Sequence, residues 1–229
     1  MGHKVNPVIH RIPFIHAWDS KWFARKENLP TVLRQEVEIR AFLGKKLKEA
    51  NIDAISIERS PKELTIIILA GKPGVVIGRS GQGLELIRKE IEKKILQNKI
   101  KVKLNIQPVH QPALSAEIVA QNAVSEIERR MPFRRVMKQT IEKTMAAGAQ
   151  GVKIKMAGRL NGVEIARRET LAAGKMSLIT LRSNVDYAFV EAHTIYGKIG
   201  VKVWVYHGLA FGRRDRFAAV KEENKNPAK

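Results

Sequence analysis

Hydrophobic residues recur with different periods along the first half of the chain, and these periods predict a mixed fold. Between positions 34 and 50 the apolar residues fall three or four apart, which is typical of an amphipathic helix: Ile39, Phe42, Leu43, Leu47 and Ala50. The segments 54–58 and 64–69 read as strands joined by a turn around Ser60-Pro61, and the second is so rich in β-branched residues that we expect it to be buried on both faces. A helix beginning near Leu84 and a strand over 101–107 follow.

The second half of the chain also predicts both helices and strands. One apolar helical face is predicted between Leu114 and Arg130, and Pro132 suits the first turn of another helix that runs to about Ala147. The alternating segments 152–156 and 201–206 indicate strands, and Asn161-Gly162 indicates a turn. The predicted fold class is α+β: helices on one face of a three-stranded sheet, then a second α+β domain of two helices on a mainly antiparallel sheet.

Prolines and polar segments suggest the domain boundaries. We expect an N-terminal arm over 1–33, where Pro7, Pro13 and Pro30 interrupt any long helix, a first domain over 34–110 and a second over 111–208. The remaining residues, 209–229, are polar and mostly charged, so we expect them to form a basic tail that is disordered when free.

The charge of the chain indicates its class of partner. The 229 residues include 42 basic and 22 acidic ones, giving a formal net charge of +20, which favours a polyanion. Because no apolar stretch of about 18 residues occurs and the basic residues are spread over folded segments, nucleic acid is favoured and no membrane contact is expected. The chain has no cysteine, which excludes disulfides and thiolate chemistry. Since no signal-peptide core is recognisable either, we expect a cytoplasmic protein.

The segment Gly78-Arg79-Ser80-Gly81 is the first candidate binding site. It fits neither the mononucleotide P-loop nor the dinucleotide fingerprint, and the simplest interpretation is a turn in which glycine supplies a positive φ. However, an apolar lead-in precedes it and an amphipathic helix follows, so that two glycines bring the backbone close to a sugar-phosphate strand. This context predicts a type II KH domain, whose loop holds single-stranded RNA.

A second candidate site is the basic arc of Arg134, Arg135 and Lys138 on the helix after Pro132. Such an arc is usually only a solvated helix face. Arg129 and Arg130 lie just upstream, and like charges at this density repel one another unless an anion lies nearby. We therefore expect this arc to contact nucleic acid.

Other basic residues suggest further RNA contacts through phosphates: Arg129, Arg130, Lys153, Lys155, Arg159 and Arg167. The six histidines are scattered and no acidic cluster suggests a two-metal nuclease. We expect no catalytic residue, no metal and no cofactor.

Several segments together resemble the bacterial family of small-subunit ribosomal protein S-three. In chain order they are MGHKVNP at 1–7, PGVVIGRSG at 73–81, MPFRRVMK at 131–138, GRLNGVEIAR at 158–167, EAH at 191–193 and GVKVW at 200–204. The resemblance covers residues 1 to about 208 in order and without large gaps. It is far more specific than the glycine-rich loop alone.

This resemblance implies a structural constituent of the small ribosomal subunit head that binds small-subunit rRNA and is not an enzyme. Its implied neighbours are the tenth and fourteenth proteins of the small-subunit series. In the family, a basic patch on the C-terminal domain lines the mRNA entry channel and helps to open messenger helices during translation. Arg134, Arg135 and Lys138 match that patch residue by residue.

Two other functions stay open from the residues alone. A free KH regulator of transcripts or of transcription termination would bind short single strands sequence-selectively as an isolated protein. A basic nuclease or RNA chaperone would cleave or remodel RNA without ribosomes, although the lack of an acid–base constellation argues against cleavage.

Overall fold

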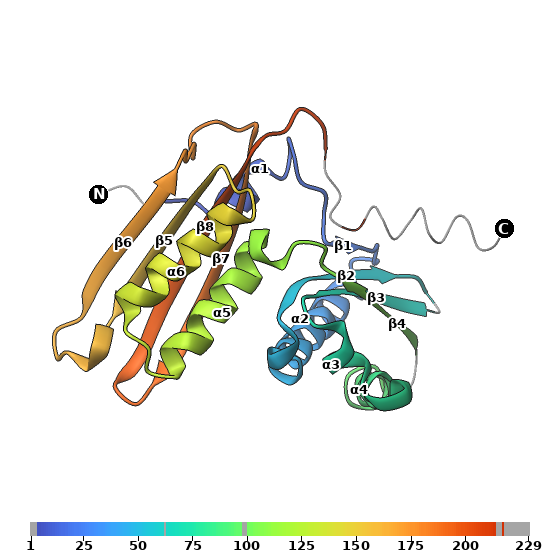
Figure 1. The fold of residues 1–229 in the computed structure, drawn as a ribbon. Helices are drawn as coiled ribbons and strands as arrows, with labels where there is room; N and C mark the ends of the chain where they lie inside the picture. Colours follow the sequence, from blue (N-terminus) through green and yellow to red (C-terminus); the bar gives the residue numbers. More distant parts are fainter. Residues whose placement is uncertain (1–3, 62, 98–99, 214–216, 218–229) are drawn as a thin grey trace. The chain divides into compact units, whose positions relative to one another are not determined.

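The computed structural model describes residues 4–61, 63–97, 100–213 and 217 (Figure 1). They form two compact units: an N-terminal unit of residues 18–110 with Phe217, and a C-terminal unit of residues 4–17 and 111–213. Within these described ranges no helix is long and apolar enough to cross a membrane. Within the tail that was predicted to be disordered, residues 209–213 and 217 are described and Phe217 is buried; the other residues lie outside the described ranges.

The N-terminal unit is a four-stranded sheet with its helices on one face (Figure 1). Its elements are β1 (Ser20–Lys21), α2 (Leu29–Lys46), β2 (Ile52–Arg59), β3 (Glu63–Ala70), α3 (Pro73–Ile77), α4 (Gln82–Lys94) and β4 (Lys101–Pro108). The strand order is β1-β2-β3-β4. Strands β2 and β3 are antiparallel, whereas β3 and β4 are parallel. A parallel pair needs a crossover connection, and α3 and α4 supply it.

The core of this unit follows the predicted apolar periods. Ile39 and Leu43 of α2 and Ile91 of α4 are buried against Ile66 and Ile68 of β3. The opposite face of β3 is also buried, because Ile67 and Leu69 pack with Phe217. The helices, the strands and the two-sided burial of β3 are confirmed. Helix α2 begins earlier than predicted, since Pro30 lies in its first turn, where a missing N–H costs nothing.

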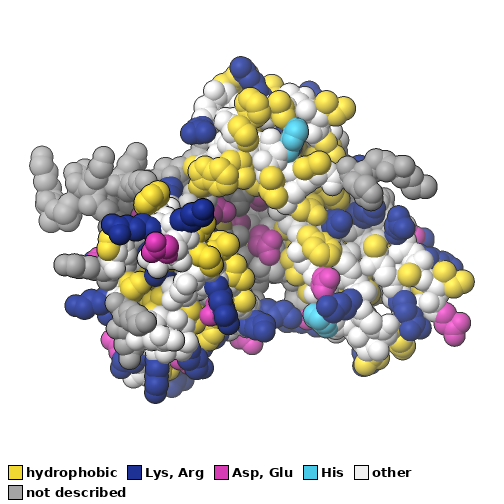
Figure 2. All heavy atoms as spheres, turned by 180° about the vertical axis from the view of Figure 1, so that it is seen from behind, with side chains coloured by type: hydrophobic (Ala, Val, Ile, Leu, Met, Phe, Trp, Pro, Cys, Tyr) yellow, Lys and Arg dark blue, Asp and Glu magenta, His cyan; other side chains and the backbone are white. Residues whose placement is uncertain are grey.

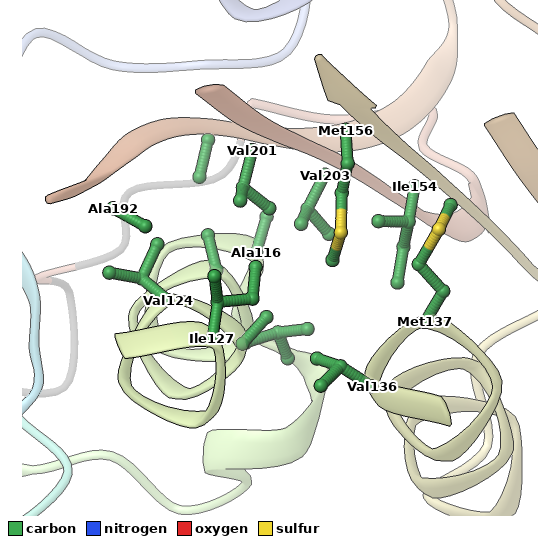
Figure 3. Packing of buried hydrophobic residues seen from close by; sticks show 14 of the residues in the cluster. Ala116, Val124, Ile127, Val136, Met137, Ile154, Met156, Ala192, Val201 and Val203 are labelled. Carbon is green, nitrogen blue, oxygen red and sulfur yellow. The ribbon is translucent and has the colours of Figure 1, made fainter. Parts of the chain in front are cut away.

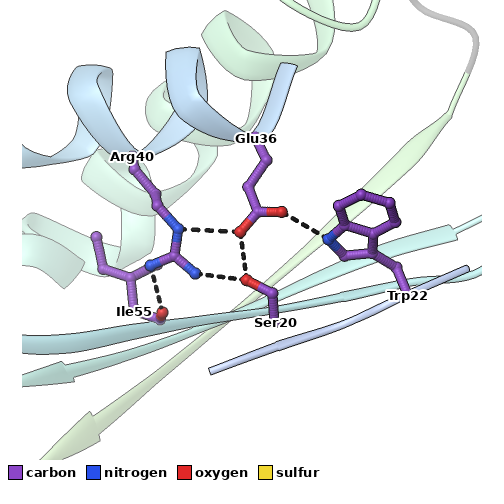
Figure 4. A network of polar contacts seen from close by, with 5 residues as sticks. All are labelled: Ser20, Trp22, Glu36, Arg40 and Ile55. Atoms are coloured by element: carbon purple, nitrogen blue, oxygen red, sulfur yellow. Dashed lines mark hydrogen bonds and ion pairs between the residues drawn. The ribbon is translucent and has the colours of Figure 1, made fainter. Parts of the chain in front are cut away.

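A polar network attaches β1 to this unit (Figure 4). The Glu36 carboxylate accepts hydrogen bonds from the Ser20 hydroxyl and from Trp22 Nε1, the latter at 2.6 Å. Arg40 donates to Glu36 at 3.1 Å, to Ser20 Oγ at 2.8 Å and to the Ile55 carbonyl at 2.8 Å. Burial alone would raise the pKa of Glu36, but these donors outweigh it and lower that pKa. The network adds a short fourth strand to the predicted three-stranded sheet.

The C-terminal unit packs two helices on one face of an antiparallel sheet (Figure 1). Its elements are α1 (Pro7–Arg11), α5 (Ala116–Glu128), α6 (Phe133–Ala146), β5 (Gly151–Gly158), β6 (Arg167–Gly174), β7 (Ser183–Thr194) and β8 (Gly197–Leu209). The strand order is β6-β5-β8-β7, and every neighbouring pair is antiparallel. The α+β class and the two predicted helices are confirmed.

One face of this sheet is buried under α5 and α6 (Figure 3), while Val185, Trp204 and Tyr206 form a smaller buried cluster on the other face. Val124 of α5 and Val136 of α6 meet Ile154, Met156 and other inward-pointing strand residues, all nearly inaccessible to solvent. Because side chains alternate along a strand, the residues between them must point away from the helices. The alternation predicted for 152–156 and 201–206 therefore has a polar and aromatic outer face.

The segment expected as an N-terminal arm divides between the two units. Residues 4–17 belong to the C-terminal unit, where α1 is capped by Asn6, whose Oδ1 accepts from Val8 N at 2.9 Å. The buried Arg11 guanidinium donates to the Leu178 carbonyl at 2.8 Å and to the Thr180 carbonyl at 3.0 Å. Arg11 thus fastens the N-terminal residues to the segment between β6 and β7.

Candidate nucleic-acid interface

The glycine-rich loop joins α3 to α4 in the N-terminal unit. Gly78 has a φ of +69° and Gly81 a φ of +78°, in the region that glycine adopts without steric cost. Between them, Arg79–Gly81 forms one 3₁₀ turn. The Gly78 amide donates to the Gly74 carbonyl at 3.0 Å and so ends α3. The chain therefore reverses within a few residues.

Gly83, in the first turn of α4, sets the distance between the two helices. A Cβ at this position would lie 2.8 Å from the Val76 carbonyl oxygen and 3.1 Å from that of Ile77. Only glycine lets α4 begin so close to α3. The first amides of a helix lack partners within it, so this junction gathers N–H groups where an anion can bind.

The surface of the loop is open and cationic. Arg79 is exposed, and a Cβ built on Gly81 would meet no atom within 4 Å. The Ser80 side chain lies outside the described part of the structure. Backbone amides, one guanidinium and free space together suit a sugar-phosphate strand.

The predicted basic arc lies on the solvent side of α6. Arg134, Arg135 and Lys138 are all exposed. Arg134 Nη2 lies 3.3 Å from Glu169 Oε1, but the Arg134 side chain remains 74% exposed. Within the described ranges, no ion pair involves Arg135 or Lys138. Acidic side chains among the described residues therefore leave most of the positive charge of the arc unneutralised, so that an anionic ligand could bind there.

Three further predicted residues lie beside this arc. A shallow hollow of about 270 Å³ has Arg134 and Arg167 in its lining. A larger hollow of about 510 Å³ is lined by Arg130, together with Met131 and Phe133. Arg129 is also exposed, at the end of α5. The structure thus gathers Arg129, Arg130 and Arg167 on the same side of the C-terminal sheet as the arc.

Arg159 has a different environment from the other predicted contacts. Its guanidinium donates to the Val163 carbonyl at 2.9 Å, to the Tyr196 carbonyl at 3.4 Å and to the Gly162 carbonyl at 3.5 Å. It also lies 5.6 Å from the centre of the Tyr196 ring. Each of its three guanidinium nitrogens donates one hydrogen bond within the protein, so Arg159 ties the turn after β5 to the β7–β8 hairpin.

Lys153 and Lys155 lie on the opposite face of the sheet from α6. Both belong to β5, where Ile154 between them faces the helices. The structure therefore separates the predicted RNA contacts of the C-terminal unit into two surfaces. Sequence reasoning missed other cations of the outer face, including Lys202, although the alternation over 201–206 placed it opposite the apolar residues.

Among the described residues, no group of three or more His, Asp or Glu side chains is placed to hold a metal ion. The site consists of amides, lysines and arginines. Such groups bind anions by charge and hydrogen bonding.

The arrangement defines a KH-domain protein with a second α+β domain. Residues 38–114 match the family described as "KH domain", and residues 124–205 match "Ribosomal protein S3, C-terminal domain".

Full-length relatives extend the match beyond the separate domains. The chain is 47% identical over 208 residues to "Small ribosomal subunit protein uS3" of Desulforamulus reducens, covering 91% of this chain and 93% of the relative. Identity is 45% over 208 residues with the protein of that name from Laribacter hongkongensis, covering 91% of this chain and 88% of the relative. With that of Paraburkholderia phymatum it is 43% over 223 residues, covering 97% and 83%. This chain belongs to the uS3 family of small ribosomal subunit proteins. The names denote ribosomal proteins, which confirms the family resemblance and the expectation that the chain is not an enzyme.

Proposed function

We propose that this chain is a structural constituent of the small ribosomal subunit in the cytoplasm, where it binds small-subunit rRNA. Membership of the uS3 family supports this role. A net charge of +20 supports RNA as the partner. In the subunit head, the tenth and fourteenth proteins of the series would be its neighbours.

The finer part of the proposal concerns messenger RNA. Arg134, Arg135 and Lys138 line the mRNA entry channel, bind the incoming messenger through its phosphates and help to open its helices. The observation that carries this is the exposed basic arc, in which the described residues give Arg135 and Lys138 no acidic partner. Charge at this position stabilises separated strands, while the translating ribosome supplies the work.

The ribosomal role is tested by sedimentation. We expect the protein to co-sediment with small subunits in a sucrose gradient of cell lysate at moderate salt. Its absence from that fraction would contradict the role and would favour a free RNA-binding regulator.

The messenger role is tested by replacing Arg134, Arg135 and Lys138 together with alanine. All three side chains are exposed, so the variant should fold and assemble, but translate structured messengers more slowly than unstructured ones. Lys143→Ala is the matched control, because Lys143 lies on the same helix and pairs with Glu126 at 3.5 Å. Normal speed of the triple variant on structured messengers would refute the messenger role.

A further inference from the structure

We propose that the outer face of the C-terminal sheet, completed by the N-terminal residues, is a second RNA-backbone site separate from α6. Its cations, which we call the outer basic surface, are Lys4, Lys153, Lys155, Arg168 and Lys202. The inference rests on the proposed function in one respect, that the polyanion is RNA. The outer basic surface is nevertheless built from different residues than the messenger arc.

Strand register brings these cations together. Lys155 of β5 pairs with Lys202 of β8, and on the other side of β5 it pairs with Thr170 of β6. In the same way, Lys153 lies opposite Trp204. Two residues along a strand span about 7 Å, and neighbouring strands lie about 5 Å apart. The result is a closely spaced array of positive charges on one surface.

The pairing of Lys155 with Lys202 is unfavourable for the isolated protein. Like charges directly opposite each other on neighbouring strands destabilise a sheet. Neither lysine has an ion-pair partner among the described residues, and none of the described residues that line this hollow is acidic. An arrangement of like charges that has no acidic partner among the described residues points to an external anion.

The array lies in a hollow large enough for a strand of nucleic acid. The hollow has a volume of about 850 Å³, and residues of α1 form part of its wall. Lys4 enters the lining because Arg11 fastens the N-terminal segment by its bonds to Leu178 and Thr180. Figure 2 shows the side of the molecule opposite to that in Figure 1, with dark blue Lys and Arg side chains exposed on it.

Aromatic rings hold two of the lysines in place. Lys153 Nζ lies 5.6 Å from the centre of the Trp204 ring, and Lys202 Nζ lies 5.3 Å from that of Phe189. Burial and the nearby cations Lys4 and Lys155 lower the pKa of Lys153. A phosphate in the hollow would offset that repulsion and favour the charged lysine.

The composition of the surface favours phosphates over bases. Trp204 is only 8% exposed, so its ring face is not available for stacking. Lysine binds phosphate as a point charge and reads no base sequence. We therefore infer that this surface binds the RNA backbone independently of sequence.

The test compares Lys202→Gln with Lys198→Gln in the full chain. The two lysines lie on the same strand and differ by four positions, but Lys198 pairs with Glu191 at 2.8 Å. The probe is a labelled 20-nucleotide RNA of mixed sequence, used single-stranded and as a duplex, titrated at several salt concentrations. Lys202→Gln should weaken RNA binding several-fold and lower the slope of log K against log salt concentration by about 0.7 to 0.9. Lys198→Gln should change both the affinity and this slope by clearly less. Scrambling the sequence should not change the difference.

Thermal unfolding separates binding from folding. Since Lys202→Gln removes a like-charge pair, the Tm of the free protein should stay the same or rise while RNA affinity falls. Equal effects of the two variants on binding, or a loss of affinity accompanied by a lower Tm, would overturn the proposal. If inorganic phosphate raised the Tm of both variants equally, the protein would be responding to any anion. This result would also overturn the proposal.

Combining variants keeps this proposal distinct from the messenger role. In the Arg134→Ala, Arg135→Ala, Lys138→Ala background, Lys202→Gln should lower the logarithm of the binding constant by the same amount as in the wild type, because separate sites contribute additively. Loss of the Lys202→Gln effect in that background would show one shared site. Translation speed on structured messengers remains the separate measure of the messenger role.

Discussion

The glycine-rich loop and the arc on α6 both present positive charge to solvent, but they do so by different means. At the loop, the groups proposed to bind RNA are backbone amides whose positions depend on Gly78, Gly81 and the close approach of α4 at Gly83. On α6, the proposed binding groups are side chains on a helix that would form without them, because Val136 and Met137 bury its other face. We therefore expect RNA binding by the loop to be coupled to folding, and RNA binding by the arc to be removable while the fold stays intact.

The largest expected effect on stability comes from Gly83→Ala. The added Cβ meets the Val76 carbonyl oxygen at 2.8 Å, so α4 must move away from α3. We expect a loss of about 1–3 kcal/mol in the free energy of unfolding, measured by urea denaturation, together with weaker RNA binding.

Gly44→Ala is the matched control for this substitution. Gly44 also lies in a helix, but a Cβ there meets nothing within 4 Å. It should stabilise the protein by up to about 1 kcal/mol, because alanine is the better helix former. Similar destabilisation by both variants would mean that the α3–α4 contact is not what glycine provides at position 83.

The smaller expected effects concern charge alone. Arg79→Gln in the loop and Arg135→Gln on α6 should each leave the free energy of unfolding within about 0.5 kcal/mol of the wild type, since both side chains are exposed. Each should lower the salt slope for single-stranded RNA by about 0.7, read from filter binding. A large loss of stability in the Arg135→Gln variant would remove the distinction between loop and arc.

Most of the fold could be predicted because its helices and strands carry regular apolar periods. The face of α4 containing Ile87 and Ile91 and the alternation around Ile154 are local signals, and the structure bears both out. Strand β1 had no such signal, because it is only two residues long and is held by Glu36 and Arg40 on a distant helix.

The candidate site was predictable in its charges but not in their surroundings. The exposed arc on α6 follows from helical spacing. In contrast, the carbonyls that accept hydrogen bonds from Arg159 belong to two separate turns. The docking of residues 4–17 likewise depends on Arg11 reaching carbonyls of residues that lie 167 and 169 positions away. Such contacts form only in the folded chain between residues that are far apart in the sequence, so no local sequence pattern predicts them.

Photo-crosslinking gives the sharpest test of the proposed contact between the arc on α6 and messenger RNA in the small subunit. A photoreactive side chain would replace Lys138, and in a control variant Lys143, which lies on the same helix and is exposed. Purified small subunits would then be loaded with a labelled messenger and irradiated. We expect a messenger crosslink from position 138 that exceeds the one from position 143. Crosslinks from position 138 to rRNA alone, or equal messenger crosslinks from the two positions, would contradict it.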